Sequence, residues 1–334
     1  MSDLDTSSHP YNALTPDVML DAIETTGLVC DGSMLALNSY ENRVYQVGIE
    51  DASPVIVKFY RPGRWSDEAI LEEHAFALEL AEHEIPLVAP MADAEGRTLL
   101  EHAGYRFAVF PRRGGHWPEL DNAENRLWLG RFIGRIHAVG ATRAFRHRPT
   151  LTIESFGDAS LSYLQEHGFI PGHLRAAYDS LVPDLLTQVR AAFARAGTVA
   201  TLRLHGDCHP GNILWTDAGP HFVDLDDARM GPAVQDLWML LSGERGERTV
   251  QLGDLLEGYE EFRDFDPREL HLVEALRTLR LLHYSAWLAR RWDDPAFPRS
   301  FPWFNTDRYW EEQVLTLREQ AAALDEPPLS VYAI

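Results

Sequence analysis

Lysine is almost absent from this sequence: Lys58 is the only one among 30 basic residues, and the other 29 are arginines. Cysteine is nearly as scarce, and Cys30 and Cys208 together cannot form the disulfide framework of a small secreted protein. No apolar run approaches the roughly 18 residues of a membrane-spanning helix. Residues 1–16 are acidic and polar, which is not the pattern of a signal peptide. We therefore expect a cytoplasmic protein that has no membrane partner.

Positive charge is also in short supply, because 51 acidic residues give the 334-residue chain a formal charge of −21. Such a surface repels nucleic acids and anionic membranes, so neither is an expected partner. An anionic ligand must instead be held by a metal ion, a few placed cations or backbone amides. Lys58 is a candidate cation, since a compact ammonium can serve a phosphate and a carboxylate together. The alternative is that the position of this single lysine is due to chance.

The order of predicted elements indicates an α+β protein with two lobes. Helices are expected at 15–27, capped by Thr15, and at 66–84, capped by Ser66, with strands around 34–48, 54–60 and 98–111. After the break "PRRGG" at 111–115 the pattern becomes helical, apart from short strands at 212–215 and 221–227. The break predicts a small β-rich lobe over 1–110 and a larger helical lobe over 111–334.

Polar side chains of several kinds crowd into one predicted loop, "RLHGDCHPGNILW", at 203–215. Asp207 and Asn212 lie five positions apart around a Pro-Gly turn, and a hairpin then returns Asp224 beside Asn212. Asn212 and Asp224 offer hard oxygen ligands that suit Mg²⁺, which leaves Asp207 to accept or orient a hydroxyl proton. Together with Lys58, these residues are the parts that phosphoryl transfer requires.

The same loop allows other interpretations. His205, Cys208 and His209 could bind zinc, although consecutive residues of a tight loop rarely converge on one tetrahedral ion. Hydrogen bonds that fix the loop are the alternative function for the histidines. Cys208 is either a small buried residue or a redox-sensitive thiol. His137, on an apolar helix face, is expected to be a hydrogen-bonded core residue.

Two motifs in combination, "HGDCHPGN" at 205–212 and "VDLDDA" at 223–228, resemble the signature of the aminoglycoside phosphotransferase and choline kinase group. The stretches "LNSYENRVYQ", "IVKFYRP", "ILEEHAFALEL", "GPAVQDLWMLL" and "DPAFPRSFPWF" resemble, more narrowly, the stress response kinase A (RdoA) family of serine/threonine protein kinases. The similarity runs over nearly the whole chain. It implies a bilobal protein-kinase-like fold, with a nucleotide-binding lobe at 1–110 and a catalytic and substrate lobe at 111–334.

The resemblance also implies an activity and a set of functional residues. The expected enzyme is a monomeric kinase that uses ATP and Mg²⁺ to phosphorylate Ser/Thr residues of proteins in a stress response. The family's roles fall on these positions: catalysis on Asp207 and Asp224, metal binding on Asn212 and Asp224, and nucleotide binding on Ser39, Lys58 and Glu73. Glu72 remains the alternative to Glu73 as partner of Lys58. Asp226 could assist Asp224, and Asp236 resembles the aspartate that binds catalytic-loop amides.

Two departures from the pattern of protein kinases are visible in the sequence. The turn "NSYEN" has no glycine, so its phosphate contact should use Ser39 and turn amides. Gly206 stands where many protein kinases have arginine, so control by a phosphorylated activation loop is not expected. Two rival functions stay open. One is a small-molecule kinase for an alcohol such as homoserine, choline or an aminoglycoside, and the other is a pseudokinase that acts only as a binding module.

Overall fold

The computed structural model describes residues 10–331 of the chain, so most of the acidic and polar N-terminal stretch, residues 1–9, lies outside it. The described residues form two compact units. Unit 1 comprises 10–118, 145–148 and 211–227, and unit 2 comprises 119–144, 149–210 and 228–331. None of the helices within 10–331 is both long and apolar enough to cross a membrane.

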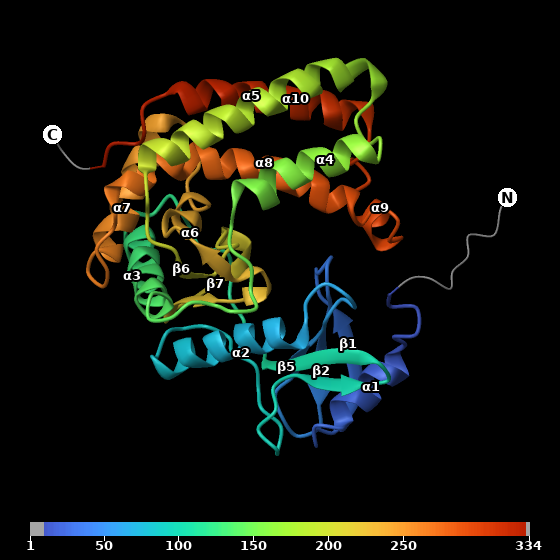
Figure 1. Cartoon of the computed structure of the whole chain (residues 1–334). Coiled ribbons are helices and arrows are strands. Elements are labelled where there is room, and N and C mark those ends of the chain that lie inside the picture. Colours follow the sequence, from blue (N-terminus) through green and yellow to red (C-terminus); the bar gives the residue numbers. More distant parts are fainter. Residues whose placement is uncertain (1–9, 332–334) are drawn as a thin grey trace. The chain divides into compact units, whose positions relative to one another are not determined.

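Unit 1 is built on an antiparallel sheet with the strand order β1-β2-β3-β5-β4 (Figure 1). Its strands are β1 Cys30–Ala36, β2 Arg43–Ile49, β3 Val55–Phe59, β4 Leu100–His102 and β5 Tyr105–Pro111. Strand β3 lies between β2 and β5, where Lys58 is paired with Val44 and Ala108. Because side chains alternate along a strand, Val57 and Phe59 point to one face of the sheet and Lys58 to the other.

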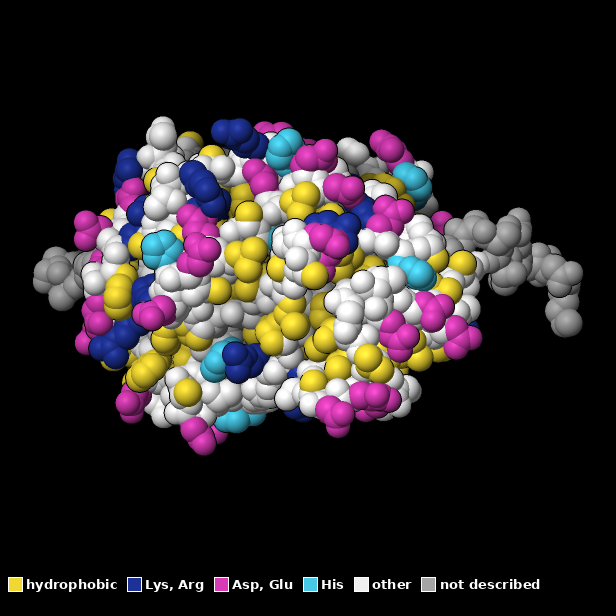
Figure 2. Space-filling model, turned by 90° about the horizontal axis from the view of Figure 1, so that it is seen from below, with side chains coloured by type: hydrophobic (Ala, Val, Ile, Leu, Met, Phe, Trp, Pro, Cys, Tyr) yellow, Lys and Arg dark blue, Asp and Glu magenta, His cyan; other side chains and the backbone are white. Residues whose placement is uncertain are grey.

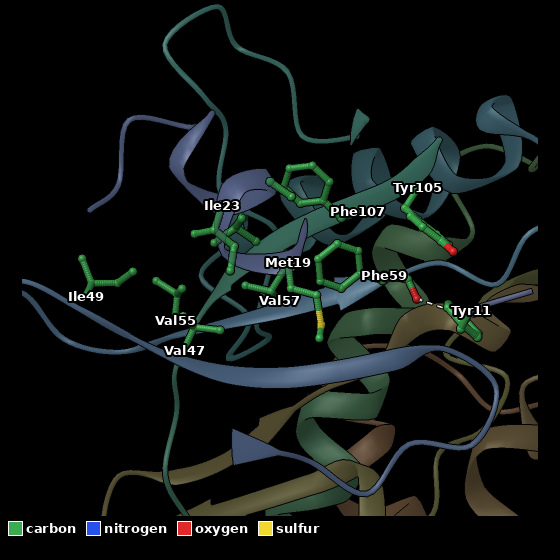
Figure 3. Packing of buried hydrophobic residues seen from close by; sticks show 12 residues of the cluster. Tyr11, Met19, Ile23, Val47, Ile49, Val55, Val57, Phe59, Tyr105 and Phe107 are labelled. Carbon is green, nitrogen blue, oxygen red and sulfur yellow. Dashed lines mark hydrogen bonds between the residues drawn. The ribbon is translucent and has the colours of Figure 1, made fainter. Parts of the chain in front are cut away.

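A helix covers each face of this sheet. Helix α1, Pro16–Glu24, packs Met19 and Ile23 against β-strand residues of the first face (Figure 3). Helix α2, Asp67–Glu82, packs Ile70 against residues of the second face. The predicted caps are confirmed, since the side chains of Thr15 and Ser66 accept hydrogen bonds from the first turns of the two helices. Lys58 therefore points toward the face that α2 covers.

Later segments of the chain return to unit 1. A hairpin of β7, Ile213–Thr216, and β8, Gly219–Phe222, follows the 3-10 turn η3, Pro210–Asn212, and leads into η4, Leu225–Asp227. His116 and Trp215 exchange backbone hydrogen bonds of 3.0 and 2.7 Å. Residues 111–118 consequently belong to unit 1, whereas the division of the chain into lobes at 110/111 stays a prediction. A boundary drawn once along the sequence cannot include segments that return through the fold.

Unit 2 is mainly helical. Its helices are α3 Ala123–Gly140, η2 Glu154–Asp158, α4 Ala159–Glu166, α5 Gly172–Ala196, α6 Val234–Trp238, α7 Arg245–Tyr259, η5 Pro267–Leu272, α8 Val273–Ala289, α9 Ala296–Ser300 and α10 Asp307–Asp325, with a two-stranded ladder of β6 Leu202–Leu204 and β9 Arg229–Gly231. Helices α3 and α7 approach closely, since a Cβ at Gly134 would lie 2.6 Å from the Tyr259 carbonyl oxygen. Helix α6 is short and ends at Trp238.

The predicted α+β class is confirmed: an antiparallel sheet dominates the first unit and helices dominate the second. Asp and Glu side chains are scattered across the face shown in Figure 2, which agrees with the net charge of −21.

Candidate active site

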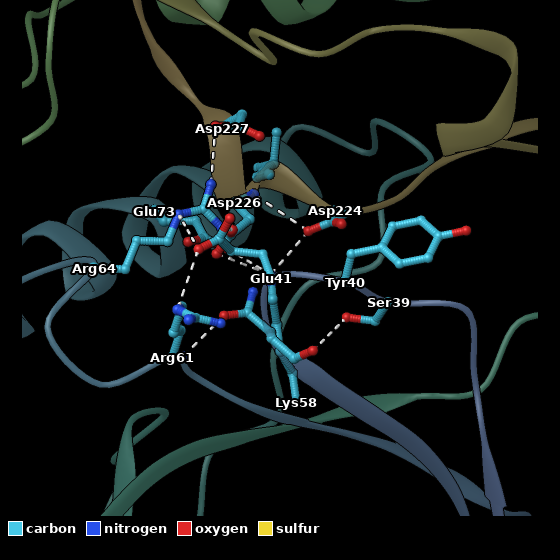
Figure 4. Close-up of polar contacts among 12 residues, drawn as sticks. Ser39, Tyr40, Glu41, Lys58, Arg61, Arg64, Glu73, Asp224, Asp226 and Asp227 are labelled. Atoms are coloured by element: carbon cyan, nitrogen blue, oxygen red, sulfur yellow. Dashed lines mark hydrogen bonds and ion pairs between the residues drawn. The ribbon is translucent and has the colours of Figure 1, made fainter. Parts of the chain in front are cut away.

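The ammonium of Lys58 lies among three carboxylates in unit 1 (Figure 4). Its Nζ is 2.8 Å from an oxygen of Asp224, 3.4 Å from one of Asp226 and 3.6 Å from one of Glu73. Lys58 comes from β3, Glu73 from α2, and the two aspartates from the segment after β8. Lys58 and Asp224, which are 166 positions apart in the sequence, therefore meet in one cluster, and Asp226 lies two positions farther on.

Burial and charge act in opposite directions in this cluster. Burial lowers the pKa of the Lys58 ammonium, but Asp224, Asp226 and Glu73 outweigh it and hold that pKa well above its ordinary value. Burial raises the pKa of the Glu73 carboxyl to about 7 in spite of the neighbouring ammonium. Lys58 is therefore a permanent cation, whereas Glu73 changes its protonation near neutral pH.

The two neighbouring glutamates of α2 have different partners. Glu73 lies beside Lys58 and also 3.5 Å from a guanidinium nitrogen of Arg148. The Glu72 carboxylate accepts hydrogen bonds of 2.6, 2.7 and 3.0 Å from the N–H groups of residues 146, 147 and 148. The structure thus places Glu73, and not Glu72, next to Lys58. Glu72 instead holds the 145–148 segment to α2.

Asp226 is buried, as Glu73 is, whereas Asp224 is not. It pairs with Arg64 as well as with Lys58, and Arg64 also donates to Asp227 at 3.1 Å. Burial raises the pKa of Asp226, but the charges of Arg64 and Lys58 outweigh it and keep that pKa below its ordinary value. Asp226 is therefore engaged in holding the cations of the cluster in place.

Arg148 fixes the acidic segment from the other side. It donates to the carbonyl oxygens of Leu225 and Asp226, and its guanidinium lies 4.4 Å from the centre of the Trp65 ring. Sequence reasoning missed Arg64 and Arg148, because nothing in their neighbouring residues distinguishes them from the other arginines. Their positions in unit 1 reveal their role.

Asn212 and Asp224 flank the open end of the β7–β8 hairpin. Ile213 pairs with Phe222 there, and the N–H of Val223 donates to the Asn212 carbonyl at 3.0 Å. Asp224 follows with φ of 63°, a left-handed conformation that aspartate adopts more readily than most residues, and its side chain is 52% exposed. An amide oxygen and an accessible carboxylate are ligands that Mg²⁺ accepts together with water and phosphate oxygens. The residues at this hairpin end therefore fit a magnesium ion.

The turn between β1 and β2 is fixed by side chains. The Ser39 hydroxyl donates to the Asn42 carbonyl at 2.8 Å, and the Asn42 side chain accepts from the N–H of Arg61 at 3.0 Å. The Tyr11 hydroxyl donates to the Glu41 carbonyl at 3.3 Å. These bonds order a turn that lacks glycine. The contact of Ser39 with ATP stays a prediction.

In unit 2, Asp236 of α6 holds the loop that precedes Asp207. Its carboxylate accepts hydrogen bonds from the N–H groups of His205 and Gly206 at 2.8 and 2.9 Å, and His137 Nε2 lies 3.0 Å away. The predictions for Asp236 and for His137 as a core residue are confirmed. Gly206 has φ of 84°, which costs glycine little. Glycine in place of arginine thus has a conformational reason.

The Asp207 carboxylate lies between a guanidinium and an imidazole of the same unit. Arg280 Nη1 of α8 is 2.7 Å from Oδ1, and His209 Nε2 is 3.5 Å from Oδ2. Burial raises the pKa of Asp207, but the hydrogen bond from His209 and the charge of Arg280 outweigh it and hold that pKa well below its ordinary value. Asp207 is therefore a weak base, better suited to orienting a hydroxyl than to deprotonating it in advance.

The zinc interpretation of this loop finds no support. Within residues 10–331, no group of three or more His, Cys, Asp or Glu side chains could hold a metal ion. Cys208 is 1% exposed, and burial raises the pKa of its thiol well above the ordinary value. Both cysteines are free thiols, and Cys208 is a small buried residue of the unit 2 core.

Comparison with known proteins connects this geometry to a family. The model of the phosphotransferase enzyme family (APH) matches residues 34–273, a range that contains every predicted site residue. The chain belongs to this phosphotransferase family. Stress response kinase A of Escherichia coli K12 is 48% identical over 328 residues, which cover 98% of this chain and 99% of that protein. Serine/threonine protein kinase RdoA of Salmonella typhimurium is 47% identical over 321 residues, covering 96% and 97%.

Solved structures show the same fold at lower sequence identity. An amicoumacin kinase, hAmiN, in complex with AMP-PNP, Ca²⁺ and Ami has a TM-score of 0.70 at 18% identity, covering 95% of this chain and 96% of that one. A microcompartment-associated aminopropanol kinase has a TM-score of 0.70 at 17% identity, covering 95% and 100%. The predictions of a phosphotransferase with a kinase-like fold and of the stress response kinase A family are confirmed.

Proposed function

We propose that this phosphotransferase is a kinase that uses ATP and Mg²⁺ to phosphorylate serine and threonine residues of proteins in a stress response. The observation that carries the proposal is the Lys58 cluster of unit 1. A buried ammonium is held by Glu73 while it faces Asp224, whose carboxylate stays accessible to solvent. The identity of 48% to stress response kinase A supports the same conclusion.

Each predicted site residue of unit 1 then has a role in binding the nucleotide. Lys58 would bind phosphate oxygens of ATP, and Glu73 keeps its ammonium in position. Asn212 and Asp224 would hold the magnesium ion, which when bound neutralises charge on the phosphates. Ser39 would donate its hydroxyl to a phosphate oxygen after releasing the Asn42 carbonyl. These roles agree with the residues present, and ATP is the expected co-substrate for this family.

Phosphate transfer does not require Asp207 to be a strong base. The acceptor hydroxyl oxygen forms a bond to the γ-phosphorus, while the bond from that phosphorus to the β–γ bridging oxygen breaks and its electron pair leaves with ADP. Asp207 accepts a hydrogen bond from the hydroxyl and receives its proton as the new bond forms. Because such transition states are loose, a weak base that orients the hydroxyl is sufficient.

The surroundings of α8 bear on the acceptor. The Arg290 guanidinium lies 4.8 Å from the Tyr163 ring centre, and the Arg291 guanidinium lies 5.2 Å from that of Trp287. A site for a quaternary ammonium would need such aromatic faces, together with carboxylates and few cations. These contacts favour a polypeptide hydroxyl over choline-like acceptors. They leave an uncharged alcohol, such as a small-molecule kinase would use, as the second candidate.

Transfer of label from γ-labelled ATP tests the proposal. The purified full chain is offered generic proteins, including basic ones that its acidic surface should attract, and in parallel a panel with homoserine, choline and an aminoglycoside. Phosphoserine or phosphothreonine in the protein arm supports the proposal, with Asp207→Asn as control. Saturable transfer to one alcohol and to none of the proteins would establish the small-molecule kinase instead. ATP binding without any transfer would indicate a pseudokinase.

We further propose a monomer located in the cytoplasm, in which residues 1–110 serve nucleotide binding and 111–334 serve catalysis and substrate binding. Size-exclusion chromatography with light scattering tests the first statement. Nucleotide titrations of variants in each range test the division of roles.

A further inference from the structure

The proposed catalytic aspartate has a cationic partner within its own unit. Arg280 Nη1 lies 2.7 Å from the Asp207 carboxylate, and the Arg280 side chain is 36% exposed. The guanidinium thus faces solvent as well as Asp207. Any acceptor hydroxyl that reaches Asp207 therefore comes close to a fixed positive charge.

Helix α8 itself adds little negative charge to offset Arg280. Glu274 is the only acidic residue of α8, and it is engaged by Arg248 at 2.5 Å and by Arg277 at 3.3 Å. On the other side of Asp207, His209 adds a second donor at 3.5 Å. The carboxylate that pairs with Arg280 is therefore that of Asp207, from the loop after β6, and the one carboxylate of α8 itself is engaged by other arginines.

We infer that Arg280 positions the Asp207 carboxylate and selects acceptors by charge, disfavouring those with a positive charge beside the reacting hydroxyl. Serine and threonine residues flanked by acidic or neutral residues would then be preferred to those flanked by lysine or arginine. The inference rests on the proposed function, because it takes Asp207 as the residue that meets the acceptor hydroxyl. It deepens that function by naming the local chemistry of the substrate.

Two electrostatic effects of different range must be separated. The net charge of −21 attracts basic proteins from a distance, but salt screens this attraction beyond about 10 Å at 0.1 M ionic strength. Arg280 acts at contact distance, where screening is weak. A basic protein can therefore be attracted to the surface while a lysine next to the target serine is rejected.

Paired peptides test the inference at 0.15 M salt. Each contains one serine, flanked by two glutamates in one peptide and by two lysines in the other. The full chain is compared with Arg280→Gln, Arg280→Lys and a control, Arg308→Gln. Arg308 is an exposed arginine of α10 in the same unit, paired with Glu312 at 2.8 Å, so its variant removes one charge away from Asp207.

The native chain should show the higher kcat/KM with the glutamate peptide. Arg280→Gln should shift the ratio of the two kcat/KM values about tenfold toward the lysine peptide, mainly through KM, which is the effect of about 1.4 kcal/mol. It should also lower kcat for both, since Asp207 loses its partner. Arg280→Lys should restore the ratio more fully than kcat, because an ammonium supplies charge without the guanidinium fork. Arg308→Gln should change neither.

The outcomes separate this inference from the function on which it rests. An equal loss with both peptides in Arg280→Gln, at an unchanged ratio, would mean that Arg280 only positions Asp207, and selection by charge would be wrong. If only small alcohols are phosphorylated, choline and an uncharged alcohol of similar size replace the two peptides. The shift in the ratio of their kcat/KM values between the native chain and Arg280→Gln then decides whether Arg280 selects by charge. If no acceptor is phosphorylated by the native chain, the proposed function fails and the inference fails with it.

Discussion

Replacing Lys58 with methionine should destabilise unit 1, because three carboxylates would lose their shared cation. Methionine keeps an unbranched apolar stem in the buried position and removes only the ammonium. Removing one partner of a buried ion pair typically costs about 3–5 kcal/mol, since the opposite charge stays buried. The Lys58 Nζ lies within 3.6 Å of Asp224, Asp226 and Glu73, so we expect a loss in the upper part of this range.

The loss should depend on pH in a defined direction. The pKa of Glu73 is already raised to about 7 by burial, and removal of the ammonium can only raise it further. A carboxyl whose pKa is higher in the folded state binds protons on folding, so stability is gained as the pH falls toward its unfolded pKa. Between pH 8 and pH 6 the deficit of Lys58→Met should therefore shrink by up to about 1.4 kcal/mol, since one pKa unit corresponds to about 1.4 kcal/mol and the native Glu73 already titrates over half of this interval.

Urea unfolding of the native chain and the variant at both pH values measures this effect. Arg131→Met is the matched control, because Arg131 pairs with Glu261 at the surface and its loss should cost little stability at either pH. A deficit of Lys58→Met below 1 kcal/mol, or one that is equal at pH 8 and pH 6, would refute the electrostatic account of the cluster.

Four further predictions concern the proposed site. Asp207→Asn should retain ATP binding and lower turnover by roughly 10²-fold or more, and near-normal turnover would remove Asp207 from its role. Asn212→Ala and Asp224→Ala should each weaken Mg²⁺-dependent nucleotide binding in calorimetric titrations, and unchanged affinity in both would refute the metal assignment. Lys58→Arg should lower activity in the transfer assay despite the conserved charge, because the wider guanidinium does not fit among three carboxylates; an active variant would favour chance as the reason for the lone lysine. Cys208 should resist thiol reagents in the native chain, since it is buried and its thiol pKa is raised; peroxide inactivation that Cys208→Ser prevents would show instead that the thiol is accessible.

Local sequence signals predict many of the helices and strands and name the candidate residues for phosphoryl transfer. The caps at Thr15 and Ser66 were predictable because capping depends on neighbours three residues away. The β-branched run around Lys58 predicted strand β3, because alternation and branching are local properties. The hairpin that brings Asp224 back to Asn212 was predictable for the same reason, since both residues adjoin its two short strands.

The choice between Glu72 and Glu73 needed the fold. Successive helical residues point about 100° apart, so only one of the two can face Lys58, and the sequence does not state the rotation of α2 about its axis. Packing decides it: Ile70 and Phe76 are buried against the rest of unit 1, which turns Glu73 inward and leaves Glu72 to accept from the 146–148 amides.

The ion pairs between distant residues were decided by tertiary structure alone. Arg280 is one of 29 arginines, and no spacing rule connects a residue of α8 with Asp207; likewise nothing marks Arg64 or Arg148 as partners of the acidic segment. The motif residues could be named in advance because their chemistry is carried by adjacent positions. Their charged partners could not, because a Coulomb interaction depends on distance in space, which only the folded chain defines.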